Sequence, residues 1–218
     1  GGVEGALSIG DHCRIEARGR QMLLCEVVGF SGGHARVMPF GALEGVGLGC
    51  RVEVGASGPM IYPDASWLGR VIDAFGRPID GKGPLPAGDK AYPIHASPPR
   101  AHNRQRVGGK IDLGVRGMNA FLTVCKGQRM GIFSGSVIGK STLLSMMARH
   151  TDADISVIGL VGERGREARE FIEDDLGSEG MARSVVVVAT SDEPPLVRRQ
   201  AAYITMAMCE YFRDLNRD

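Results

Sequence analysis

The stretch 129–144 constrains the fold of this chain more than any other. It reads RMGIFSGSVIGKSTLL: an apolar run, a loop of small residues, and a segment with apolar side chains at helical spacing. An apolar strand that leads through a tight loop into an amphipathic helix is the repeating unit of α/β proteins. The pattern therefore predicts a strand over residues 129–133 and a helix from Lys140 to His150.

The loop in this stretch has the composition that phosphate binding needs. Backbone N–H groups in a loop of small residues form an anion-binding nest, and the start of the following helix adds its positive dipole end. We expect Lys140 to reach the β- and γ-phosphates of ATP and the Ser141 hydroxyl to coordinate Mg²⁺. The alternative is a Gly/Ser turn that happens to precede a helix with a lysine. The candidate nucleotide-binding residues are Ser134, Gly135, Ser136, Val137, Ile138, Gly139, Lys140, Ser141 and Thr142.

Composition excludes several classes of protein. The chain has 218 residues, 43% hydrophobic residues and a formal net charge of +1, so no overall field attracts nucleic acid or a membrane. The five cysteines are scattered, which favours a reducing compartment over disulfides or a zinc site. No run is apolar enough to span a bilayer, and we expect no leader peptide, because no basic segment followed by an apolar one stands out. We therefore expect a soluble, cytoplasmic protein.

Residues 1–62 are expected to form a small N-terminal β-barrel of antiparallel strands. Short β-like pieces alternate there with glycine-rich turns, which is typical of small barrels. Because the chain opens at Gly1-Gly2, in what resembles the middle of a barrel, we expect further sequence upstream. The expected strands are His12–Ala17, Met22–Phe30, His34–Pro39 and Arg51–Val54.

Residues 63–111 are expected to link the barrel to a second domain, with little regular structure beyond Gly81, where Pro and Gly are frequent. Over residues 112–218 helices and strands alternate, which predicts a parallel sheet covered by helices, with ligands at the carboxyl ends of the strands. The other expected elements are helix Val115–Leu122, strand Ile155–Val161, helix Arg166–Leu176 closed by Gly177, strand Val185–Ala189 and helix Leu196–Leu215.

Glu163 is the second candidate for chemistry, because it follows the expected strand Ile155–Val161 after a single glycine. If this strand lies near the one that leads into the phosphate loop, the Glu163 carboxylate emerges beside the γ-phosphate. A carboxylate in that position can polarise an attacking water, which hydrolysis requires. The alternative is a charged residue that simply decorates the start of a helix. Placement alone leaves both interpretations open.

With these motifs in view, the chain resembles the hexameric RecA-like ATPases related to the catalytic subunits of rotary ATP synthases. Within that family it is most similar to the type III secretion branch, which includes the flagellum-specific export ATPases. The resemblance spans most of the chain. The matching segments are LGRVIDAFGRPIDG (68–81), GVRGMNAFL (114–122), GQRMGIFSGSVIGKSTLL (127–144), VIGLVGERGREARE (157–170) and CEYFRD (209–214).

The resemblance implies an α/β fold, with a small N-terminal antiparallel β-barrel followed by a truncated RecA-like P-loop NTPase core built on a parallel sheet. It implies that ATP and Mg²⁺ are bound, that Lys140 holds the phosphates, and that Ser141 or Thr142 contacts the metal. Glu163 becomes the catalytic glutamate and Arg164 helps to position it. The implied function is ATP hydrolysis that helps to unfold or release substrates and chaperones in flagellar type III protein export.

The resemblance also implies partners and a location. The chain is expected to form a homohexamer with nucleotide at the subunit interfaces. It is expected to work with a stator-like regulator, a stalk subunit and the export gate, at the inner face of the bacterial cytoplasmic membrane. Nucleic acid is not an expected partner, because the barrel offers only Phe30 and Phe40, with Tyr62 at its edge, for base stacking.

This sequence departs from the family pattern in two ways. Val137-Ile138 stand where the family loop has Gly-Val, and a β-branched residue does not readily adopt positive φ. We therefore expect weakened nucleotide binding, unless the loop accommodates Val137 with negative φ. The chain also stops at Asp218, before the family's Mg²⁺-organising aspartate and arginine finger, so we expect no ATP turnover by this polypeptide alone.

Two alternative functions remain open. A virulence-type secretion ATPase shares every motif quoted above. A non-catalytic subunit of a RecA-like hexamer is favoured if Val137 abolishes nucleotide binding, although Glu163 argues against it, because such a subunit has no need of a carboxylate there.

Overall fold

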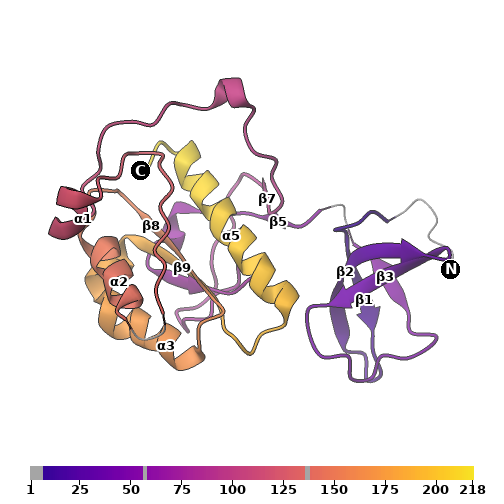
Figure 1. Cartoon of the computed structure of the whole chain (residues 1–218). Helices are drawn as coiled ribbons and strands as arrows, with labels where there is room; N and C mark the ends of the chain where they lie inside the picture. Colours follow the sequence, from indigo (N-terminus) through magenta and orange to yellow (C-terminus); the bar gives the residue numbers. More distant parts are fainter. Residues whose placement is uncertain (1–6, 56–57, 136–137) are drawn as a thin grey trace.

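The computed structural model describes residues 7–55, 58–135 and 138–218, and it is an α/β protein with two principal sheets (Figure 1). The first sheet is antiparallel, and its strands run in the order β3-β2-β1-β4. Within the described residues, β3 and β4 form its two edges and do not pair with each other, so the predicted closed barrel is not confirmed. The strands are β1 (His12–Glu16), β2 (Met22–Ser31), β3 (His34–Pro39) and β4 (Val52–Val54), close to the predicted ranges.

The tightest turn of this sheet shows how the local sequence determines the pairing. Ser31 of β2 pairs with His34 of β3, so only Gly32 and Gly33 connect the two strands. Their φ angles are 58° and 74°, and a two-residue hairpin loop with positive φ at both positions matches the twist of antiparallel strands. Residues with a Cβ rarely adopt this conformation, which explains the glycine pair.

The second sheet is parallel and contains β6 (Arg70–Ile72), β9 (Ser184–Ala189) and β8 (Ser156–Val161) in the order β6-β9-β8. The valine-rich β9 lies in the centre, as its continuous apolar run predicts for a strand covered on both faces. β6 comes from the segment that the sequence suggests is a linker, so the parallel sheet draws on residues before position 112.

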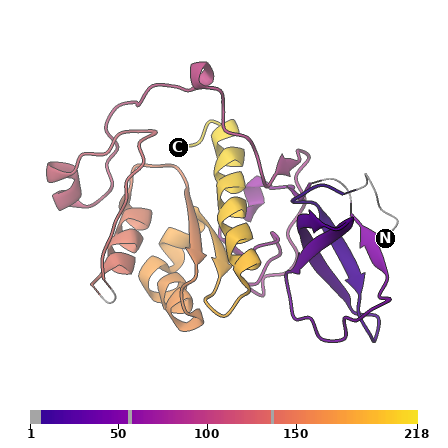
Figure 2. The ribbon, with the colours of Figure 1, turned by 45° about the vertical axis from the view of Figure 1, so that its right-hand side comes forward.

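Helices cover both faces of the parallel sheet (Figure 2). Val185 and Val187 of β9 pack in one buried cluster with the long helix α5 (Pro195–Asp214). Val186, which points to the opposite face, packs in a second cluster with residues of three shorter helices. These are α2 (Lys140–His150), α3 (Gly165–Glu170) and α4 (Gly177–Ala182). The predicted three-layer arrangement around a parallel sheet is therefore present.

One sequence-based prediction of local structure is wrong. Residues 129–133 form no strand, because no described segment pairs with their backbone, and they remain largely exposed, with Phe133 at 95% exposure. The prediction that Gly177 closes the helix ending at Leu176 is confirmed. α3 continues into a π-helical segment, Phe171–Leu176, which Gly177 caps with a φ of 62°, and the separate helix α4 follows up to Ala182.

The intervening segment is tied to the core by short elements and side-chain contacts. β5 (Met60–Ile61) pairs with β7 (Tyr92–Pro93), and the remaining short helices are the 3₁₀ turns Ala65–Trp67 and Ala101–Asn103 and α1 (Arg116–Phe121). Arg70 of β6 donates hydrogen bonds to Asp80 at 2.7 and 2.9 Å. The Lys90 ammonium donates to Asp214 at the end of α5, at 2.9 Å. No helix in the described part of the chain is long and apolar enough to cross a lipid bilayer.

Candidate functional site

The loop and helix that the sequence singles out meet at Gly139. Gly139 directly precedes α2 with a φ of 87°, a conformation that favours glycine. In the described structure no side chain caps the first turn of α2, so its N–H groups remain available to an anion. Lys140 is the first residue of the helix and places a second source of positive charge there. This local geometry suits a phosphate group.

Glu163 lies at the same place, although 23 sequence positions separate it from Lys140. It follows the carboxyl end of β8 after Gly162. The Lys140 Nζ atom lies 3.6 Å from Glu163 Oε1, and both side chains are about half-exposed, at 43% and 36%. The structure therefore brings together the ammonium and the carboxylate that the sequence selected independently, on a surface that a ligand can reach.

The main chain around Glu163 is held by the loop after β9. The Gly162 N–H donates to the Ala189 carbonyl at 2.8 Å, and the Ser191 N–H donates to the Glu163 carbonyl at 2.9 Å. The sequence analysis missed this loop. The signal that could have found it is the adjacency of β8 and β9, because the carboxyl ends of neighbouring parallel strands meet at one edge of the sheet.

A second acidic group lies in the loop after β9. Asp192 accepts a hydrogen bond from the Thr190 side chain, and this contact is the main reason why its pKa lies below the ordinary value. Asp192 therefore carries its negative charge at neutral pH. It lies one residue beyond Ser191, whose N–H holds Glu163, so this loop carries a charged residue close in sequence to that contact.

The other predicted site residues are more dispersed. The Ser134 hydroxyl donates to the Gly135 carbonyl at 3.1 Å, and the Ile138 side chain is 71% exposed. Ser141 and Thr142 are exposed in the first turn of α2. The Arg164 guanidinium lies 3.2 Å from Glu167 rather than against Glu163.

Two of the predicted site residues, Ser136 and Val137, lie outside the described residues, so the predicted effect of Val137 stays a prediction. No group of three His, Cys, Asp or Glu side chains with the spacing of a protein metal site occurs among the residues that the structure describes. The Ser141 hydroxyl and the Glu163 carboxylate are oxygen donors of the kind that Mg²⁺ prefers, and Mg²⁺ usually takes its remaining ligands from phosphates and water.

Comparison with known proteins places these features in a family. Residues 114–218 match the family model described as the nucleotide-binding domain of the ATP synthase alpha/beta family. The flagellum-specific ATP synthase of Caulobacter vibrioides is 55% identical over 212 residues, which cover 97% of this chain and 48% of that protein. The flagellum-specific ATP synthase of Bacillus subtilis is 49% identical, over 96% of this chain and 48% of that protein.

Secretion ATPases are similar as well. The type 3 secretion system ATPase of Xanthomonas euvesicatoria is 46% identical, over 95% of this chain and 47% of that protein. The assembled ATPase EscN of the enteropathogenic E. coli type III secretion system superposes with a TM-score of 0.87 at 36% identity, over 97% of this chain and 50% of that chain. The chain therefore spans about half the length of the relatives it matches. Its sequence and its fold agree that it belongs to the ATP synthase alpha/beta family, within which it is similar to the flagellum-specific ATP synthases and type III secretion ATPases.

Proposed function

We propose that this chain is the nucleotide-binding half of an ATPase that drives flagellar type III protein export. ATP hydrolysis at the Lys140–Glu163 site would be coupled to the release of export substrates and their chaperones. The flagellar assignment is preferred over a virulence secretion system because the identity to the Caulobacter relative, 55%, exceeds the 46% to the Xanthomonas secretion ATPase.

The observation that carries the proposal is the 3.6 Å contact between Lys140 and Glu163 at the uncapped start of α2. A phosphate chain laid across this helix start accepts hydrogen bonds from the first-turn N–H groups and from Lys140. Its terminal phosphate then lies beside Glu163, which can accept a proton from an attacking water. A simple anion site at a helix start does not require that carboxylate, and for this reason we favour hydrolysis over binding alone.

The roles of the other site residues are part of the same proposal. We propose that Ser134 to Thr142 form the nucleotide loop, with Ser141 as a ligand of Mg²⁺, which would neutralise charge on the phosphates. Glu163 would hold the attacking water. Arg164 would help to position Glu163, and its guanidinium is paired with Glu167 in this structure.

The larger-scale organisation is part of the proposal. We assign residues 1–62 to a barrel-type N-terminal domain, 63–111 to an entry segment and 112–218 to the first part of a RecA-like core. Support comes from the superposition with EscN, which covers 97% of this chain. EscN has been described as an assembled ATPase and in complex with its central stalk EscO. By analogy, we propose a homohexamer that meets a stalk subunit, a stator-like regulator and the export gate at the inner face of the cytoplasmic membrane.

Nucleotide binding by this chain is the first test, measured with a fluorescent ATP analogue and Mg²⁺. Lys140→Ala should weaken binding by about tenfold or more, because a charge-assisted hydrogen bond is worth about 1.5–3 kcal/mol. Lys110→Ala, at an exposed lysine on another segment, is the matched control and should bind as the parent does. A Val137→Gly variant measures the cost of the unusual loop residue. Equal binding by the Lys140 and Lys110 variants would reject the proposed site.

Export itself is tested with a chimera that replaces the matching half of the Caulobacter flagellar protein with this chain. The chimera should hydrolyse ATP and restore swimming to cells that lack the native protein. Glu163→Gln in the chimera should abolish both activities without weakening nucleotide binding. A chimera that binds and hydrolyses ATP but does not restore export would support the proposed nucleotide site and contradict the proposed role in export.

A further inference from the structure

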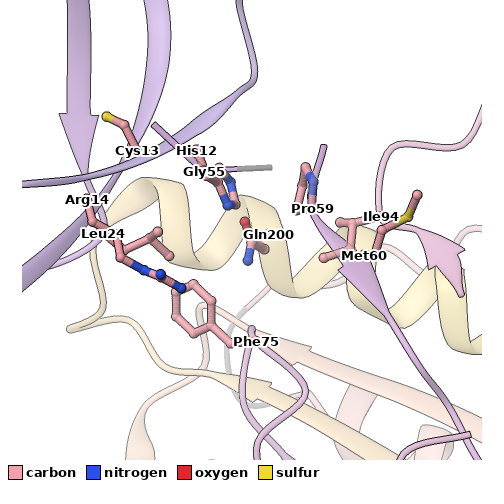
Figure 3. A pocket seen from close by; sticks show the side chains of 10 residues that line it. All are labelled: His12, Cys13, Arg14, Leu24, Gly55, Pro59, Met60, Phe75, Ile94 and Gln200. Atoms are coloured by element: carbon pink, nitrogen blue, oxygen red, sulfur yellow. The ribbon is translucent and has the colours of Figure 1, made fainter. Parts of the chain in front are cut away.

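His12, the first residue of β1, lies in the contact between the N-terminal sheet and helix α5. It lines a cavity of about 410 Å³ together with Gln200 of α5, and Figure 3 shows its ring directed from β1 toward that helix. On the sheet side, the His12 ring packs edge-on against Phe40, with ring centroids 5.1 Å apart. A change in the charge of His12 therefore acts at the place where the two parts of the fold meet.

A buried ion pair lies beside His12. Glu26 of β2 is the cross-strand partner of His12, is 5% exposed, and accepts a hydrogen bond at 2.6 Å from Arg199 of α5. The ionisable groups that act on His12 are Glu26, His95, Asp11 and Arg199, and Cys13 and Arg14 line the same cavity. Among the first four, the two carboxylates favour a charged imidazole and the two basic groups disfavour it, so burial decides the balance.

Burial favours the neutral ring. The loss of hydration is the main reason why the pKa of His12 lies below the ordinary value. The Nε2 atom is buried and has no hydrogen-bond partner among the residues that the structure describes. Both ring nitrogens of a charged imidazole donate hydrogen bonds, so protonation would leave a charged N–H at Nε2 without an acceptor. The closed contact therefore accommodates His12 in its neutral form.

Separation of the sheet from α5 would remove this penalty. In water the imidazole is hydrated and takes up a proton near the ordinary pKa of about 6.5. If the open form binds more protons than the closed form, acidification shifts the equilibrium toward the open form. The contact is therefore at full strength above about pH 6.5 and becomes weaker as the pH falls below that value.

We propose that His12 makes the contact between the N-terminal sheet and α5 sensitive to protons, so that mild acid loosens the sheet from the parallel-sheet core. The neutral ring allows the sheet to stay packed on α5 at pH 7 and above. The protonated ring favours a looser arrangement in which water reaches it. This response involves neither Lys140 nor Glu163, so it does not depend on the proposed nucleotide function.

Amide hydrogen exchange of the whole chain tests the proposal. Protection factors, which are corrected for the intrinsic exchange rate at each pH, report the stability of each element. Since the N-terminal sheet must leave α5 in order to unfold, protection in β1 and β2 should fall relative to that in β8 and β9 between pH 7.5 and pH 5.5. The expected fall is more than twofold and at most about tenfold, the limit for one proton at one pH unit below its ordinary pKa.

Three histidine variants assign the effect. His12→Gln keeps a polar side chain that cannot become charged, and its protection ratio should stay constant within twofold over the same pH range. His102→Gln, at an exposed position in the intervening segment, is the matched control and should keep the dependence of the parent. His95→Gln should keep it as well, although this neighbouring ring packs on Tyr203 of α5 with centroids 4.3 Å apart.

A second measurement needs no variant and applies even if His12→Gln does not fold. In the NMR spectrum of the parent, the Cε1–H signal of His12 should titrate at a lower pH than that of the exposed His102, because burial holds the pKa of His12 below its ordinary value. The ordering of the two midpoints follows from the position of His12 in the closed contact.

Three results would overturn the proposal. The first is a change of less than twofold in the protection ratio of the parent, which would mean that the contact does not respond to protons. The second is an unchanged dependence in His12→Gln, or a dependence that only His95→Gln removes, which would assign the response to another group. The third is a His12 midpoint at or above that of His102, which would mean that the neighbouring carboxylates outweigh burial.

Discussion

At the scale of single residues, the pairing of Lys140 with Glu163 organises the candidate site. Both residues were identifiable from the sequence, because one follows a loop of small residues and the other follows a strand, and such positions meet at one edge of a parallel sheet. The orientation of Arg164 toward Glu167 was not predictable, since an exposed arginine has several carboxylates within reach. The contribution of Ser191 was also hidden, because it is made by a main-chain N–H that almost every residue type possesses.

Removing the Glu163 charge should strengthen nucleotide binding. In Glu163→Gln, Lys140 loses its paired carboxylate, and the terminal phosphate no longer faces a negative charge. Half-exposed pairs of this kind are worth about 0.2–1 kcal/mol, so we expect about a two- to fivefold gain in affinity for the fluorescent ATP analogue. Glu167→Gln, which removes a similarly exposed carboxylate paired with Arg164, should have no such effect. Weaker binding by the Glu163 variant would contradict the assigned geometry.

The ion pair between Arg70 and Asp80 should make stability depend on acid pH. The side-chain hydrogen bonds from Arg70 hold the pKa of Asp80 well below its usual range. A folded-state pKa below the unfolded value, about 3.9, stabilises the fold above that pH, and this contribution is lost as the pH falls further. Urea unfolding between about pH 5 and pH 3 should therefore show a steeper loss of unfolding free energy in the parent than in Asp80→Asn. Parallel profiles for the two proteins would exclude this cause.

At the scale of elements, the parallel sheet and its two helical layers depend on the alternation of side chains along β9. The sequence predicts this strand and the helix α5 well, because a run of valines and a long helical spacing of apolar residues leave few alternatives. The sequence does not predict that the last turns of this helix, Phe171–Leu176, are π-helical, because the packing that buries Leu176 completely is a tertiary contact. The end of the helix at Gly177 is predicted correctly, since glycine readily adopts the positive φ of a C-cap.

The predicted strand over residues 129–133 fails for a different reason. Periodicity identifies a segment that can form a strand, but a strand exists only when a neighbour accepts its backbone hydrogen bonds. The described sheet ends at β8, which pairs on one side with β9, and residues 129–133 are not paired with it. Whether a segment has such a neighbour is a property of the whole fold, which no local pattern can report.

Substitutions along α5 should separate its buried face from its exposed face. Ile204 is fully buried against the sheet, whereas Met206 is 59% exposed. Ile204→Ala leaves a cavity and should lower the unfolding free energy by about 2–5 kcal/mol, measured by urea denaturation. Met206→Ala deletes a side chain of similar size from the same helix and should change it by less than about 0.5 kcal/mol. Equal losses would mean that the helix is rotated relative to this description.

At the scale of the whole molecule, the N-terminal sheet and the core are joined by a small set of side-chain contacts, which we call the seam. Glu26 of β2 is buried and accepts a hydrogen bond from Arg199 of α5 at 2.6 Å. Phe40 stacks edge-on against Phe75 with ring centroids 5.4 Å apart and joins the core cluster that contains α5. The sequence predicted both parts but not this seam, because its contacts join residues that are 173 positions apart.

Breaking the ion pair of the seam should destabilise the contact between the two parts. Arg199→Ala leaves the Glu26 carboxylate buried without its partner, which should cost about 2 kcal/mol. Hydrogen exchange should then rise in β2 and in the middle of α5 while β8 and β9 keep their protection. The double variant Glu26→Gln with Arg199→Ala should recover part of the loss, because no unpaired charge remains. A uniform rise in exchange across the chain would indicate global destabilisation instead.

The two main-chain hydrogen bonds that join the loops after β8 and β9 affect which substitutions the protein can accept during evolution. The position of Glu163 depends on the N–H of Ser191, and a codon change there alters the side chain while leaving that N–H in place. Site 191 can therefore drift through many residue types without moving Glu163, and only proline, which has no N–H, would release the loop. A position can thus support chemistry in every descendant of a protein and still show almost no preference for a particular amino acid.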